Sequence, residues 1–311
     1  MDSRGNRQSK NGLYSSSADG RRSSRRGETF TENPVTCRMA VVGDSFTFGE
    51  EVAFADSWAY QLEQRLPLGC QVLNFGVRGY GVDQAYLRYL RDVRPWQPHV
   101  MIFGFISHDL HRVMPVYGFL LYNNVGTPWA KPRFVYEQDN LILANVPLPK
   151  LEEIIAKKSV RELPFITYEK EYRETEWGRP SWRHFYSSYL FRLLTSLHPL
   201  WERERQKTSD KNLRAINREL FQSFVKTATS DNTIPLIVYL PYGPDFRKFL
   251  GPVRYHWVLK SCRTRSLLTR IVQPVFPHYL LQKGLWTPWE AAHIIHQKEM
   301  SRFLSASIRS L

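Results

Sequence analysis

Ser45 is the residue whose type and setting best fit catalysis. It lies in a glycine-flanked turn, 43–49 (GDSFTFG), directly after the short apolar run 39–42 (MAVV). The apolar run predicts a buried strand, and the turn would lift the serine hydroxyl out of the sheet where a helix begins. Backbone N–H groups at such a corner can stabilise negative charge. The pattern therefore indicates acyl chemistry, with Ser45 as the nucleophile.

This turn resembles block I of the SGNH, or GDSL, hydrolases, a large family of serine esterases. A second segment, 74–81 (NFGVRGYG), is similar to the Asn-x-Gly-x-x-Gly turn of block II in that family. The resemblance covers roughly residues 38–112 and 234–305. It implies that the backbone N–H groups of Ser45 and Gly79 form part of an oxyanion hole.

Block III departs from the family pattern of Gly-x-Asn-Asp. The chain reads 104–110 (GFISHDL), so Asp109 aligns, but His108 stands where the asparagine donor belongs. A neutral imidazole can donate one N–H, and His108 could therefore keep part of the oxyanion hole. The alternatives are that His108 acts as the base, or that the position has lost its role.

Block V departs further. The segment 284–289 (GLWTPW) resembles the family's Asp-x-His-x-Thr-Pro-Trp-Gly, with Leu285 in place of the catalytic histidine and Lys283 or Gln282 in place of the aspartate. No Asp or Glu occurs between Asp245 and Glu290. A leucine accepts no proton, and a serine hydroxyl without a base is a poor nucleophile at neutral pH.

Another histidine would have to replace the missing base. His278 lies seven residues before Leu285 and is the favoured candidate. His293 and His296 fall within the expected last helix, where packing or surface positions are the simpler interpretation, and His256 is interpreted as structural.

Strand and helix patterns alternate along the chain after residue 38. Apolar runs predict strands at 39–42, 71–74, 100–106 and 234–240. Periodic apolar positions predict helices at 57–66, 83–94 and 211–228, and Thr287 begins a last helix. Strand–helix–strand repetition indicates right-handed crossovers and a parallel sheet. Together with the resemblance, it predicts an α/β fold: a flavodoxin-like three-layer sandwich with about five mostly parallel strands.

The domain boundaries follow from composition. Residues 1–36 are rich in Ser, Arg, Gly and Asn and predict a disordered basic tail. Residues 37–311 would form one SGNH hydrolase-like domain. Within it, the aromatic and proline-rich stretch at about 114–205 is expected to be an irregular insertion, either a lid over the catalytic face or a loop-rich elaboration.

Charge and composition limit the partners. The 311-residue chain has a formal net charge of +14, which favours an anionic ligand or simply a solvated basic surface. No recognition motif accompanies the charge, so no specific nucleic acid is expected. No apolar stretch is long enough for a transmembrane segment. The missing signal peptide favours the cytoplasm, unless the natural chain begins upstream of Met1.

The three cysteines, Cys37, Cys70 and Cys262, are widely spaced, so free thiols in a reducing compartment are the simplest expectation, with one disulfide left open. No cofactor or metal is expected. The resulting prediction is an acylesterase or deacylase acting on a small-molecule or glycan ester. Acyl transfer would use the same chemistry. The alternative is a catalytically silent relative that binds an acylated or anionic ligand or acts as a scaffold.

Overall fold

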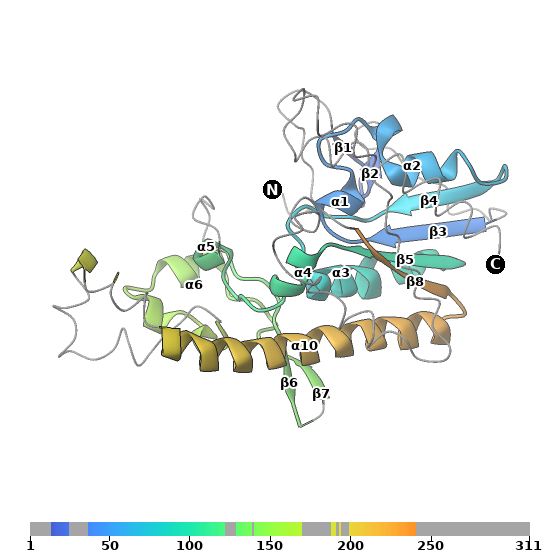
Figure 1. Cartoon of the computed structure of the whole chain (residues 1–311). Helices are drawn as coiled ribbons and strands as arrows, with labels where there is room; N and C mark the ends of the chain where they lie inside the picture. Colours follow the sequence, from blue (N-terminus) through green and yellow to red (C-terminus); the bar gives the residue numbers. More distant parts are fainter. Residues whose placement is uncertain are drawn as a thin grey trace, which may run out of the picture. The chain divides into compact units, whose positions relative to one another are not determined.

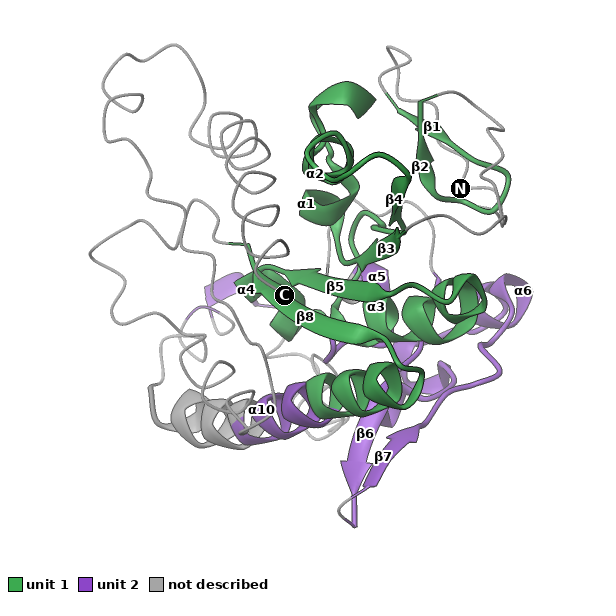
Figure 2. Ribbon diagram, turned by 90° about the vertical axis from the view of Figure 1, so that its right-hand side faces the viewer, with its two compact units in different colours: residues 1–112, 220–311 green, residues 113–219 purple. Residues whose placement is uncertain are grey.

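The computed structural model describes residues 14–24, 37–121, 129–138, 140–169, 188–190, 193 and 199–240. The chain divides into two compact units (Figure 2). The first comprises residues 1–112 and 220–311, and the second comprises residues 113–219. Each unit is described by itself.

A parallel sheet forms the centre of the first unit (Figure 1). Its strands are β3 (Cys37–Val42), β4 (Cys70–Asn74), β5 (Val100–Phe105) and β8 (Ile234–Tyr239), in the order β4-β3-β5-β8. The first of these strands thus lies between the second and the third, as in flavodoxin-like folds. The α/β prediction is confirmed. About five strands were expected, and the described residues contain four of them.

Side chains alternate between the two faces of this sheet, because successive residues of a strand point in opposite directions. On one face, Met39, Val41 and Ile102 pack with Trp58 and Leu62 of α2 (Trp58–Glu63). All five side chains are almost completely buried. This layer supports the turn that carries the candidate nucleophile.

The other face is covered by two helices of the first unit. The helix α3 (Val82–Arg88) continues through the π-helical η2 (Tyr89–Val93) and the short η3 (Arg94–Trp96). The first-unit part of α10 (Pro199–Ser230) packs aromatic rings against β5. Phe103 lies 5.5 Å from Phe221 and 5.1 Å from Phe224 between ring centroids. Of the helices described, none has the length and apolar character needed to cross a membrane.

The N-terminal prediction is wrong for residues 14–24. They form an antiparallel pair of short strands, β1 (Ser15–Ser16) and β2 (Arg22–Ser23). The Arg22 guanidinium lies 4.7 Å from the ring centroids of both Tyr14 and Phe48, and its Nη2 donates a hydrogen bond to the Val52 carbonyl at 2.9 Å. Stacking and hydrogen bonding hold this arginine in the fold instead of in a solvated tail.

The expectation of free thiols is wrong for two of the three cysteines. Cys37 and Cys70 occupy paired positions on β3 and β4, with Cα atoms 4.5 Å apart, and they are joined by a disulfide. The register of the two strands brings them together, although 33 residues of sequence separate them. Cys262 lies outside the described residues.

The second unit contains a hairpin and a small core. Its elements are β6 (Phe134–Glu137) paired with β7 (Asn140–Leu143), α5 (Gly118–Leu121), α6 (Leu151–Ile155), η4 (Val160–Glu162) and η5 (Ile166–Tyr168). Tyr117 is central, because its ring is buried and its hydroxyl donates to the Pro164 carbonyl at 2.6 Å. The buried Glu169 carboxylate accepts the N–H groups of Val116 and Tyr117.

Candidate active site

Three turns carry the predicted site residues, and each follows the carboxyl end of a strand. Ser45 follows β3, Gly79 follows β4, and His108 follows β5. The connections from β3 and β4 lead to opposite sides of β3, so the strand order reverses here. In open α/β sheets, ligands bind at this edge where the order reverses. The topology therefore gathers the predicted residues where a site is expected.

The first turn is built to present Ser45. Asp44 caps the one-turn helix α1 (Ser45–Phe48) by accepting the Phe46 N–H on Oδ1 at 2.9 Å. Gly43 has φ of +156°, and a Cβ at this position would overlap Thr47 Oγ1 and the Gly104 carbonyl. Only glycine therefore allows the strand to pass into the helix at this point.

Ser45 is buried, with 6% of the residue exposed. Its Oγ donates to Asp44 Oδ2 at 3.4 Å, a long hydrogen bond. Among the residues the structure describes, this is the hydroxyl's one hydrogen-bond partner, and no imidazole bonds to it. The candidate base, His278, lies outside the described residues, as do Lys283 and Leu285.

The second turn is fixed to the first by backbone and side-chain hydrogen bonds. The Val77 N–H donates to the Gly43 carbonyl at 3.0 Å. Asn74 Nδ2 donates to the Thr47 carbonyl at 2.9 Å, while its Oδ1 accepts the Gly76 N–H at 2.9 Å. Asn74 therefore holds the two turns together from the end of β4.

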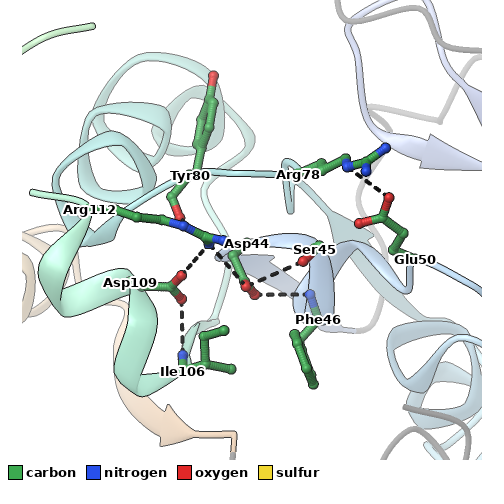
Figure 3. Close-up of polar contacts among 9 residues, drawn as sticks. All are labelled: Asp44, Ser45, Phe46, Glu50, Arg78, Tyr80, Ile106, Asp109 and Arg112. Carbon is green, nitrogen blue, oxygen red and sulfur yellow. Dashed lines mark hydrogen bonds and ion pairs between the residues drawn. The ribbon is translucent and has the colours of Figure 1, made fainter. Parts of the chain in front are cut away.

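Gly79 lies at the open side of this turn. Its φ of +79° is in the left-handed region, and a Cβ there would meet nothing within 4 Å. The neighbouring Arg78 pairs with Glu50, with 2.8 Å between Nε and Oε1 (Figure 3). This ion pair links the second turn to the end of the first.

The third turn opens α4 (Ser107–His111). Asp109 Oδ2 accepts the Ile106 N–H at 2.9 Å and so caps the helix. Burial lowers the pKa of His108 to about 4, and the charges of Arg112 and His111 contribute in the same direction. At neutral pH the His108 imidazole is therefore uncharged and has one N–H to donate.

A buried ionic cluster lies beside Ser45 and includes Asp44 (Figure 3). Arg112 Nη1 donates to Asp109 Oδ1 at 2.6 Å, to the Tyr80 carbonyl at 3.2 Å and to Asp44 Oδ2 at 3.5 Å. Burial raises the pKa of both carboxyls, and the charge of Asp44 raises that of Asp109 further. The guanidinium opposes both shifts.

Arg112 was not among the residues singled out from the sequence. The available signal was its position three residues after Asp109, a spacing that puts two side chains on one side of a helix. That spacing predicts the contact with Asp109. It does not predict the contacts with Asp44 and Tyr80, which require the three turns to meet.

No family model and no curated protein matches the sequence. Solved structures that resemble the chain include a protein assigned to the G-D-S-L lipolytic family from Desulfitobacterium hafniense, with 15% identity, a TM-score of 0.37 and coverage of 86% of this chain and 99% of that one. A variant of an acetyl-xylooligosaccharide esterase from Geobacillus has 13% identity and a TM-score of 0.43, with coverage of 88% of this chain and 95% of that one. An α/β hydrolase from the metagenome of Lake Arreo, Spain, has 11% identity and a TM-score of 0.42, with coverage of 89% of this chain and 98% of that one. Similarity at this level says nothing about catalysis, so the chemistry must come from this chain's own residues.

Proposed function

We propose that this protein is a serine ester hydrolase, an acylesterase or deacylase acting on a small-molecule or glycan ester, with Ser45 as its nucleophile. The observation that carries the proposal is the position of Ser45 on a strand-to-helix turn at the edge where the strand order reverses. The turns that carry Gly79 and His108 follow the strands on either side of β3.

The proposed reaction proceeds in two halves. Ser45 Oγ bonds to the acyl carbon, and the bond from that carbon to the alcohol oxygen breaks. The Ser45 proton passes to a base and then to the departing alcohol. The backbone N–H groups of Ser45 and Gly79, together with the neutral imidazole of His108, donate to the oxyanion. Water then hydrolyses the acyl-serine by the same steps, and an alcohol in place of water would give acyl transfer.

His278 is the proposed base. Catalysis would depend strongly on this residue, because removal of the base from a serine–histidine pair abolishes most of the rate advantage over the uncatalysed reaction in water. The sequence near His278 offers no carboxylate to orient an imidazole, since no Asp or Glu occurs from 246 to 289. His278 would therefore have to act without an orienting carboxylate from its own segment.

A second candidate is a silent relative that binds an acylated or anionic ligand or acts as a scaffold. It is favoured by Leu285 at the position expected for the catalytic histidine.

Hydrolysis of p-nitrophenyl acetate separates the two candidates. An ester hydrolase releases nitrophenol faster than buffer does, and Ser45→Ala and His278→Ala each remove the difference, while His256→Ala serves as the matched histidine control and retains activity. Equal release by the folded wild type and Ser45→Ala would favour the silent relative. If His278→Ala keeps wild-type activity while Ser45→Ala loses it, the ester hydrolase proposal would stand and His278 would be rejected as its base.

A further inference from the structure

We propose that Arg112 is a positioning residue for the nucleophile, because it fixes the carboxyl group that accepts the Ser45 hydrogen bond. This inference rests on the proposed function. It assigns to Arg112 a role in orienting Ser45 without contact between Arg112 and the substrate.

The Arg112 Nη1 atom connects the three turns. Arg112 follows α4, and its Nη1 donates to acceptors from all three turns, namely Asp44 Oδ2, the Tyr80 carbonyl and Asp109 Oδ1. The side chain is 13% exposed, while those of Asp44 and Asp109 are 0% and 3% exposed. A guanidinium in such surroundings has a fixed direction, because each alternative orientation would leave a buried carboxyl without its cation.

The Asp44 carboxyl has a double use. Its Oδ1 accepts the Phe46 N–H, and its Oδ2 receives both the Ser45 hydroxyl and Arg112. The Asp44 oxygen that accepts the Ser45 O–H is therefore also the oxygen that Arg112 contacts. Rotation of this carboxyl would move the hydroxyl that must attack the substrate.

Arg112 also supplies charge. Among the described residues, Arg112 is the one cation paired with either Asp44 or Asp109. Without it, two close buried carboxyls would compete for protons, and a protonated Asp44 would cease to be a pure acceptor for Ser45. The other titratable groups around Arg112 are His108 and His111 on α4 and Asp83 on α3. Tyr80 meets Arg112 through its backbone carbonyl.

The test compares Arg112→Met, Arg112→Lys and the control Arg91→Met, whose arginine side chain is 74% exposed on η2. Reaction of Ser45 with a fluorophosphonate is timed from pH 5 to 9, with folding checked by circular dichroism. Arg112→Met should slow labelling at pH 7 by about tenfold or more, since small misplacements of a reacting group are costly. In the pH profile of its labelling rate, the fall on the acid side should move to higher pH, because loss of the cation raises the pKa of the Asp44 and Asp109 carboxyls.

Arg112→Lys should recover part of the rate, because an ammonium can pair with one carboxyl but cannot span all three acceptors. Folded Arg112→Met that labels at the wild-type rate with an unshifted profile would overturn the inference alone. An unlabelled, folded wild type would overturn the proposed function and this role together. If Arg112→Met fails to fold, Arg112→Lys decides: a slower rate with the same shift on the acid side supports the role, and wild-type behaviour rejects it.

Discussion

Replacement of His108 by asparagine should remove a source of acid sensitivity from the folded protein. The imidazole has a pKa of about 4 in the fold, because burial disfavours the cation, whereas an unfolded histidine has a pKa near 6.5. The unfolded chain therefore takes up this proton first as the pH falls. Stability associated with His108 is complete above about pH 6.5 and is lost progressively down to about pH 4. Asparagine does not titrate, but it still carries an N–H donor.

The magnitude follows from the two pKa values. Each unit corresponds to about 1.4 kcal/mol, so the full difference is about 3 kcal/mol. Because the imidazole is only partly buried, solvent screening reduces this figure. We expect the wild type to lose about 1–2 kcal/mol more unfolding free energy than His108→Asn between pH 7.5 and 4.5.

Urea unfolding of both proteins at the two pH values measures this difference. Asp44 and Asp109 titrate in both proteins, so their contribution largely cancels in the comparison. NMR titration of the His108 ring protons gives the pKa directly, and the resonance should stay unchanged down to about pH 5. A resonance that titrates near pH 6.5, or equal pH dependence in the two proteins, would refute the account of this residue.

Two pairs of substitutions and one treatment have outcomes set by the structure. Gly43→Ala should cost about 3 kcal/mol or more in urea unfolding, because its Cβ overlaps Thr47 Oγ1, whereas Gly79→Ala should cost about 1–2 kcal/mol for its positive φ alone. Phe221→Ala should cost about 3–5 kcal/mol in the same assay, while alanine at Leu68, which is 99% exposed, should change stability by at most about 0.5 kcal/mol. Reduction of the disulfide between β3 and β4 should cost about 3–4 kcal/mol, as expected for a bridge across 33 residues, and an unchanged melting curve with dithiothreitol would contradict this.

The fold could be predicted from the sequence where a segment's own pattern decides its structure. The runs at 39–42 and 100–106 are almost wholly apolar because β3 and β5 are buried on both faces, and the structure has strands there. The helix predicted at 211–228 lies within α10, which begins earlier, at Pro199. Local signals sufficed for these elements.

Other features depend on partners that are distant in sequence. The segment 14–24 looks like a polar tail, but the Arg22 guanidinium lies 4.7 Å from the ring centroids of both Tyr14 and Phe48, and Phe48 belongs to α1. The disulfide depends on the register of β3 against β4. Neither partner set can be inferred from composition. The domain prediction, with its insertion at 114–205, stays a prediction.

The candidate site divides in the same way. Ser45 and Gly79 can be predicted as site residues because each lies in a short motif with its own turn chemistry. Arg112 could not be predicted in this way, because its contacts with Asp44, the Tyr80 carbonyl and Asp109 exist only when the three turns meet around its guanidinium. The role of His278 stays a prediction, since that residue lies outside the described part of the chain.

The most direct test of the central claim is the site of covalent labelling by a fluorophosphonate, mapped by peptide mass spectrometry on the intact, folded chain. We expect the phosphonyl group on Ser45, with labelling lost in Ser45→Ala and retained in a variant of another serine, such as Ser57→Ala. A folded protein that remains unlabelled, or one in which Ser45→Ala is labelled as fast as the wild type, would contradict the assignment of Ser45 as an activated nucleophile.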